Sequence, residues 1–167
     1  MCPEQEFRRP AGPKRHPPRE TILVVDDDPW VLALARDILA GEGYHVLEAP
    51  GGEDALRIAV DYAGPIHLLL TDVVMPGMNG RDLADRLRPT RRETKVLFMS
   101  AFTTELLADY GLISGDPLIT KPFTLAGLAH KVGEILGYRS PFARPGAAAL
   151  ETASGIGPPR LERNASG

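Results

Sequence analysis

The feature that most constrains the fold is a short run at 68–71, Leu-Leu-Leu-Thr, which is followed by a single carboxylate, Asp72. A run without polar alternation predicts a strand that is buried on both faces, as in a parallel sheet covered by helices. Asp72 is then at the carboxyl end of that strand, where open α/β sheets place their ligand sites. A turn rich in Pro, Gly and Asn at 76–80 supports this boundary.

A second run, Thr21–Val25, also ends in carboxylates, namely Asp26, Asp27 and Asp28. We interpret Asp28 as a helix N-cap, because Pro29 follows it and proline suits the first turn of a helix. Taken alone, Asp26 and Asp27 are equally compatible with capping. If both strands end at one rim of a sheet, however, their carboxylates form an oxygen cage that suits a hard divalent cation.

Strand and helix patterns alternate along the middle of the chain. Strands are predicted at about 21–25, 44–48, 66–71, 95–100 and 117–120. Helices are predicted from Pro29 to about Gly41 and at about 52–63, 80–88, 103–110 and 124–136. Five such units joined by right-handed crossovers predict an α/β fold with a doubly wound, five-stranded parallel sheet and five helices.

The composition fits one domain between two tails. The chain is 43% hydrophobic and 25% charged, which is ordinary for a soluble globular protein. We predict a domain at 20–138, a disordered, basic, Pro-rich tail at 1–19 and a disordered or weakly structured tail at 139–167. Cys2, the sole cysteine, excludes an internal disulfide and suits a reducing compartment. No apolar stretch approaches the roughly 20 residues of a membrane-spanning helix, so we expect no membrane partner.

The net charge of -3 is unevenly distributed. Residues 1–20 carry five basic and three acidic residues, and residues 140–167 carry three and two. The middle, residues 21–139, therefore holds 11 basic and 17 acidic residues, a net charge of -6. An acidic domain does not favour nucleic acid, so none is expected as a partner.

Four separated elements, each at a predicted strand end, resemble the receiver domain of bacterial two-component response regulators over about residues 20–138. They are the acid pair Asp26/Asp27, Asp72 with its Met-Pro-x-Met-x-Gly loop, Ser100 after an apolar run, and Lys121-Pro122-Phe123. Taken singly, each is compatible with an ordinary turn or surface position. The resemblance is especially close to receivers of hybrid sensor histidine kinases. It implies a flavodoxin-like, CheY-like strand order, 2-1-3-4-5, which brings these elements to one rim.

The resemblance also implies the roles of the residues at that rim. Asp72 is the expected phosphoacceptor, and Ser100 and Lys121 are expected to contact the transferred phosphoryl group. Before the transfer, Lys121 is expected to pair with Asp72. The expected metal ligands, for Mg²⁺, are Asp26, Asp27, Asp72 and the backbone carbonyl of Val74, with Asp26 acting through water. The family's Lys-Pro peptide at 121–122 is cis. Without metal, the clustered carboxylates repel one another, so at least one should have a raised pKa.

The chain departs from the family at one switch position. Many receivers have Tyr or Phe three residues before the lysine, where this chain has Leu118. We therefore assign the switch to Ser100 and Leu118 and expect another form of coupling. Phe102 and Val74 are large side chains near the phosphoacceptor, and we expect them to shield an acyl phosphate from water. Trp30 is expected to be partly exposed at the mouth of the pocket.

The expected function is that of a stand-alone, cytoplasmic response regulator. A sensor histidine kinase or a histidine phosphotransfer protein is the expected donor and docks near the helix at 29–41. An unknown downstream protein binds the face formed by 103–110, 117–120 and 124–136. We expect no enzyme activity beyond the chain's own phosphorylation and dephosphorylation.

Two other functions remain open. An aspartyl-phosphate phosphatase of the haloacid-dehalogenase type needs a second Asp two residues after its nucleophile, where this chain has Val74. A phosphorylation-independent interaction module is the other alternative, and the departure at Leu118 keeps it open.

Overall fold

A computed structural model describes residues 20–102 and 104–137. Five parallel strands form one sheet with the order β2-β1-β3-β4-β5, which confirms the predicted topology. The strands are β1 Thr21–Val25, β2 His45–Ala49, β3 Leu68–Asp72, β4 Lys95–Ser100 and β5 Leu118–Thr120. The predicted tails at 1–19 and 139–167 lie outside the described residues.

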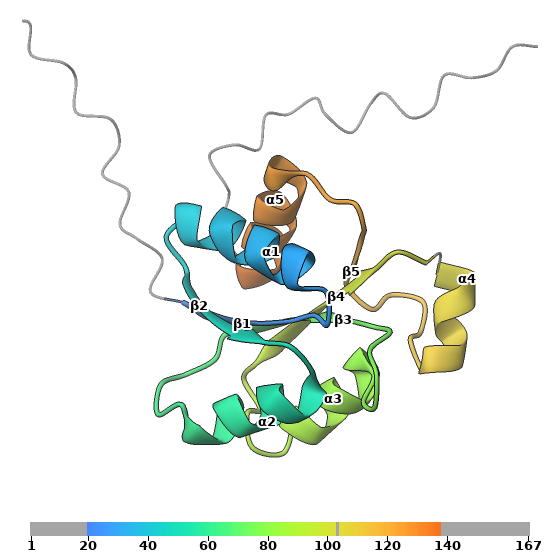
Figure 1. Ribbon diagram of the computed structural model, residues 1–167, viewed down its shortest axis with the longest axis horizontal. Helices are drawn as coiled ribbons and strands as arrows, with labels where there is room; N and C mark the ends of the chain where they lie inside the picture. The colour runs from blue at the N-terminus through green and yellow to red at the C-terminus, as the bar shows by residue number, and fades with distance from the viewer. Residues whose placement is uncertain (1–19, 103, 138–167) are drawn as a thin grey trace, which may run out of the picture.

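Helices cover both faces of this sheet. They are α1 Pro29–Gly41, α2 Gly52–Asp61, α3 Gly80–Leu87, α4 Thr104–Leu107, the 3₁₀ helix η1 Ala108–Tyr110 and α5 Leu125–Leu136. Helices α1 and α5 lie on one face, α2 and α3 lie on the other, and α4 stands beyond the β5 edge (Figure 1). No helix in the described part of the chain is both long and apolar enough to cross a membrane.

The interior has two layers because the strands point successive side chains to opposite faces. In β1, Ile22 and Val24 pack in the layer under α1 and α5, whereas Leu23 and Val25 pack in the layer over α2 and α3. All four side chains are fully buried. The middle of β1 and the start of β3, Leu68–Leu70, therefore carry apolar side chains on both faces, as the sequence predicts.

Short polar side chains begin three of the helices. Asp28 accepts a hydrogen bond from the Trp30 N–H at 2.8 Å, so its predicted role as the α1 N-cap is confirmed. Asn79 caps α3, and Thr124 caps α5. These caps satisfy N–H groups that have no partner within the helix, and they start α1 and α3 directly after the loops that follow β1 and β3.

The strand register brings the carboxyl ends of the central strands level with one another. Val25 pairs with Thr71, so the next residues, Asp26 and Asp72, are neighbours. On the other side of β3, Asp72 itself pairs with Met99. The last pair of β4 and β5 joins Ser100 to Thr120, one residue before Lys121.

Most element boundaries lie within one or two residues of the prediction, and two of the differences have a structural cause. Strand β3 starts at Leu68 rather than at 66, because the Ile66 carbonyl accepts a hydrogen bond from the Thr94 hydroxyl instead of joining the ladder. The helix predicted at 103–110 is a four-residue α4 followed by the tighter η1. Gly111 then ends it with a φ of 81°, a left-handed conformation that glycine adopts readily.

Candidate functional site

Three carboxylates converge at the rim where β1 and β3 end. Asp26 and Asp27 follow β1, and Asp72 is the last residue of β3. One carboxylate oxygen from each lies within 4.8 Å of the others. Asp26 is buried, Asp72 is partly buried and Asp27 is exposed, so the cluster opens toward solvent on one side.

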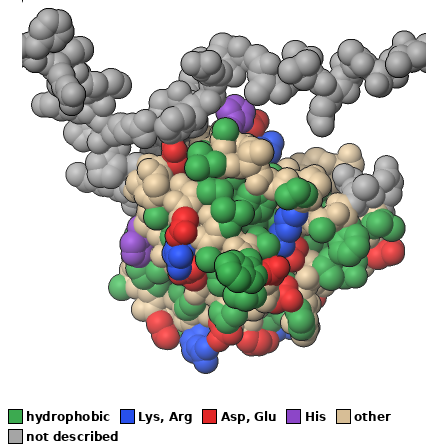
Figure 2. Space-filling view, turned by 45° about the horizontal axis from the view of Figure 1, so that its top comes forward, with side chains coloured by type: hydrophobic (Ala, Val, Ile, Leu, Met, Phe, Trp, Pro, Cys, Tyr) green, Lys and Arg blue, Asp and Glu red, His purple; other side chains and the backbone are tan. Residues whose placement is uncertain are grey.

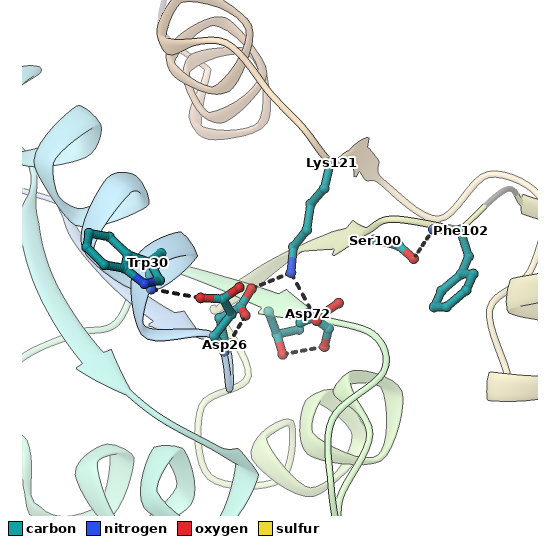
Figure 3. A network of polar contacts seen from close by, with 8 residues as sticks. Asp26, Trp30, Asp72, Ser100, Phe102 and Lys121 are labelled. Carbon is teal, nitrogen blue, oxygen red and sulfur yellow. Dashed lines mark hydrogen bonds and ion pairs between the residues drawn. The ribbon is translucent and has the colours of Figure 1, made fainter.

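Lys121 reaches into this cluster from the end of β5 (Figure 3). Its Nζ donates to Asp26 Oδ2 at 2.6 Å and to Asp72 Oδ2 at 3.0 Å. Its backbone N–H donates to the Ser100 carbonyl at 2.7 Å, which fixes the start of the side chain beside β4. The Lys121–Pro122 peptide is cis, as the family resemblance implies. One ammonium group therefore joins carboxylates from β1 and β3.

Burial makes the Asp26 carboxyl a weaker acid than an ordinary aspartic acid. The loss of hydration raises the pKa of Asp26 above its ordinary value, although hydrogen bonds from Lys121 and from the Asp28 N–H act in the opposite direction. A raised pKa in the cluster was predicted, but its main cause at Asp26 is burial, and the predicted repulsion, here from Asp72, is the smallest contribution. Burial alone lowers the pKa of Lys121, but its hydrogen bonds to Asp26 and Asp72 outweigh this effect and raise it.

The charge and chemistry of the cluster fit a hard divalent cation. Three carboxylates against one ammonium leave two negative charges at the rim. Every side chain of the cluster that can ligate a metal offers oxygen, the donor that Mg²⁺ and Ca²⁺ prefer. The neighbouring Asp28 carboxylate caps α1 and is not a member of this cluster.

The backbone around Asp72 is held closely. The Thr71 hydroxyl donates to the Asp72 carbonyl at 2.9 Å. A Cβ added to Gly80 would lie 2.1 Å from that carbonyl oxygen, far inside van der Waals contact. The glycine of the Met-Pro-x-Met-x-Gly loop is thus required by the close approach of α3 to the end of β3.

Ser100 occupies the end of β4 and is fully buried. Its hydroxyl oxygen accepts the Phe102 N–H at 3.0 Å, so it is engaged with the loop that follows β4 (Figure 3). The Phe102 side chain is 47% exposed. Leu118 pairs with Phe98 at the start of β5 and packs partly buried against the core.

Two further predicted positions flank the cluster. Val74 is partly buried and packs against the apolar layer that faces α2 and α3. Trp30 is 85% exposed, so it is more open to solvent than the partial exposure that we predicted. The reason is that Pro29 and the Asp28 cap start α1 with Trp30 pointing away from the core layer formed by Ala35, Ile38 and Leu39.

Comparison with known proteins identifies the family. The model of the response regulator receiver domain matches residues 22–133. The chain belongs to the response regulator receiver family. Its carboxylate cluster and Lys121 lie together at one rim of the sheet, and Ser100 ends the neighbouring strand β4.

Relatives differ in what accompanies the receiver. The chain is 39% identical to the transcriptional regulatory protein CpxR of Escherichia coli over 116 residues, which are 69% of the chain and 48% of CpxR. It is 37% identical to the sensor kinase CckA of Brucella abortus over 121 residues, 70% of the chain and 12% of CckA. The chain thus spans about half the length of CpxR and a small part of CckA.

Solved receivers share the fold over their whole length. The receiver domain of the hybrid histidine kinase CckA is 37% identical, with a TM-score of 0.59, and the match covers 70% of this chain and 98% of that one. TrrA of Thermotoga maritima, solved in complex with Mg²⁺-BeF, is 30% identical, with a TM-score of 0.60 and the same coverage.

One contact of the receiver pocket was not predicted from the sequence. Lys121 pairs with Asp72 as the resemblance implied, but it makes a second and shorter hydrogen bond, to Asp26, that we did not predict. The signal that could have revealed it is the need of a buried carboxylate for a cation, since Asp26 follows a run, Ile22–Val25, that predicts a buried strand. Lys121 is the cation that the neighbouring strand ends bring within reach.

The raised pKa of Asp26 predicts that its buried charge lowers the stability of the metal-free protein. Asp26→Asn removes the cost of a buried charge, so the free energy of unfolding in EDTA should rise by on the order of 1 kcal/mol at neutral pH. The folded state binds the Asp26 proton more tightly than the unfolded state does. The cost of the buried Asp26 charge therefore disappears as pH falls through the folded pKa. The stability gained by Asp26→Asn should accordingly shrink toward zero in acid.

Urea unfolding of both proteins across this pH range measures the effect. Glu93→Gln is a matched control, because Glu93 is an exposed carboxylate outside the cluster. A variant less stable than the parent at neutral pH would mean that the ion pair with Lys121 outweighs the burial of Asp26.

Proposed function

We propose that this receiver accepts a phosphoryl group from a phosphohistidine onto Asp72. The observation that supports it most directly is the Lys121 ammonium, which lies 3.0 Å from Asp72 Oδ2 beside a cluster with two uncompensated negative charges. Asp26, Asp27, Asp72 and the Val74 carbonyl are the proposed Mg²⁺ ligands. Bound Mg²⁺ would supply positive charge that neutralises the phosphoryl oxygens.

In the proposed transfer, an Asp72 carboxylate oxygen forms a bond to phosphorus as the N–P bond of the donor breaks. The bonding electrons return to the imidazole nitrogen, which takes a proton from solvent. Lys121 leaves Asp72 for a phosphoryl oxygen and keeps its bond to Asp26, so the ammonium needs little movement. Positioning and neutralisation of charge then account for most of the rate.

The proposed switch uses Ser100. Its hydroxyl can donate its own hydrogen to a phosphoryl oxygen, but it now accepts from the Phe102 N–H. When the hydroxyl turns toward Asp72, it gives up the Phe102 N–H for a phosphoryl oxygen, and the loop after β4 is released. Because Leu118 offers no ring, we propose that this loop and α4 carry the change to the surface.

A downstream protein is the proposed reader of this change. The α4–β5–α5 face and the segment that joins η1 to β5 display large apolar side chains, among them Leu106, which is 57% exposed, and Ile113, which is 66% exposed. Figure 2 shows hydrophobic side chains gathered at the α4 side of the molecule. An apolar patch of this kind is typical of a surface that binds another protein.

The remaining parts of the proposal concern the setting of the receiver. A sensor histidine kinase or a histidine phosphotransfer protein is the proposed donor and docks beside α1, where Trp30 and Leu34 are exposed. The chain acts in the cytoplasm and catalyses only its own phosphorylation and dephosphorylation. Two further statements stay predictions from the sequence: that the receiver acts without an attached output domain, and that it does not contact nucleic acid.

Intact mass spectrometry after incubation with acetyl phosphate and Mg²⁺ tests the proposed acceptor. We expect a gain of one phosphoryl group that is lost in EDTA and in Asp72→Ala, because both the acceptor oxygen and the neutralising charge are needed. No gain in the parent chain, even with a phosphorylated histidine kinase as donor, would favour a phosphorylation-independent module. Steady hydrolysis of p-nitrophenyl phosphate would instead support the phosphatase alternative.

The Phe102 ring predicts the lifetime of the phosphorylated state. Phe102→Ala should accelerate phosphate loss by roughly threefold to tenfold, equivalent to about 1 kcal/mol of barrier, because water reaches the acyl phosphate more easily. Phosphate release from the purified phosphoprotein gives the rate. Leu106→Ala serves as the control, since Leu106 is a similarly exposed apolar side chain on α4. Equal rates in the parent and Phe102→Ala would contradict a shielding role.

A further inference from the structure

A groove lies at the end of the sheet opposite to the carboxylate cluster. It has a volume of about 470 Å³ and is bounded by the end of α3, the start of β4, the segment before β5 and Ile135 of α5. A second hollow of about 540 Å³ shares Arg88 and Arg92 with it. The two hollows therefore form one surface, which we call the β4 groove.

The β4 groove is positively charged. Arg81 is compensated, since it lies 3.2 Å from Asp85 and 3.1 Å from Asp116. Arg88 and Arg92 are exposed and form no ion pair with any residue that the structure describes. Lys95 donates to the Ile135 carbonyl at 2.7 Å, a bond that leaves its charge uncompensated. Four cations and two carboxylates give the groove a charge of about +2, on a domain whose central residues sum to -6.

The floor of the groove is an open strand edge. Strand β5 has three residues, and its first pair with β4 joins Leu118 to Phe98. The Lys95 N–H donates to the His67 carbonyl on the β3 side, so the backbone of the next residue, Val96, faces the β5 side. In the described chain nothing pairs with Val96 there.

The segment before β5 cannot extend the pairing. The Asp116 N–H donates to the Ile113 carbonyl, and Pro117 has no N–H to offer. The Pro117 carbonyl already accepts from the Phe98 N–H at 2.9 Å. The chain therefore turns away from β4 at this point and leaves the edge at Val96 accessible to another strand.

We propose that the β4 groove binds an extended acidic segment of a partner protein. The segment pairs with the edge of β4 at Val96, and its carboxylates contact Arg88 and Arg92. Addition of a strand to an open edge supplies backbone hydrogen bonds, and the flanking cations select acidic side chains.

A helix-dipole contact, nucleic acid or a small anion would each account for only part of the β4 groove. A cation at the end of α3 stabilises the helix dipole, which explains Arg88 but neither Arg92 nor the open edge. Nucleic acid needs a broader basic surface than three uncompensated cations on an acidic domain. A small anion would use the cations but would leave the backbone of Val96 unpaired.

Fluorescence anisotropy with the full chain tests the proposal. The probe is a short, fluorescein-labelled peptide of alternating Glu and Val, at low ionic strength. We expect saturable binding that Arg88→Glu with Arg92→Glu weakens by roughly tenfold or more, equivalent to about 1.4 kcal/mol. Arg36→Glu with Arg57→Glu is the control for the change in net charge, because Arg57 is exposed, Arg36 is partly exposed, and both lie outside the groove. Hydrogen exchange should show new protection of the Val96 amide when the peptide is bound.

Four results would overturn the proposal. A Lys/Val peptide that binds as tightly as the Glu/Val peptide would exclude selection by charge. Binding without protection of Val96, together with displacement by inorganic phosphate, would show an anion site instead. Duplex DNA that binds the parent chain but not the Arg88/Arg92 variant would indicate nucleic acid. Protection of the Val96 amide without any peptide would mean that the chain itself covers the edge.

Discussion

The Lys121 ammonium between Asp26 and Asp72 is the interaction on which the site depends. A fully buried carboxylate such as Asp26 is costly unless a cation and hydrogen bonds compensate it. The cation comes from the far side of the sheet, at the end of β5, and crosses the end of β4 to reach β1 and β3. The strand order and the level register of the strand ends therefore both serve this contact.

The same contact sets what the pocket can bind. With one ammonium among three carboxylates, the rim keeps two negative charges, which favour a divalent cation. In the proposed transfer to Asp72, Lys121 and Ser100 are the residues that contact the phosphoryl oxygens. The opposite end of the sheet carries the contrary charge in the β4 groove, so the two ends of one sheet suit different kinds of partner.

Much of this arrangement follows from the sequence, for reasons that particular residues make clear. Apolar runs that end in Asp26 and Asp72 predict buried parallel strands, and parallel strands place both residues at one rim. The order of the strands came from the family resemblance, because periodicity does not say which strands are neighbours. The bond from Lys121 to Asp26 was missed, since it joins residues 95 positions apart and depends on the path of one side chain. The division of the predicted helix at 103–110 was also missed, because helical pattern does not separate an α-helical turn from a 3₁₀ turn.

Calorimetric titration of Mg²⁺ into the parent chain and Lys121→Met tests most directly whether Lys121 holds the acid cluster in its metal-free form. Removal of the ammonium leaves three uncompensated carboxylates, so at mildly alkaline pH we predict an affinity higher by roughly tenfold. Lys131→Met, which changes a lysine on the surface of α5, should leave the affinity unchanged. Weaker or equal binding by Lys121→Met would contradict the account, because it would show that Lys121 does not compensate the charges that the cation meets.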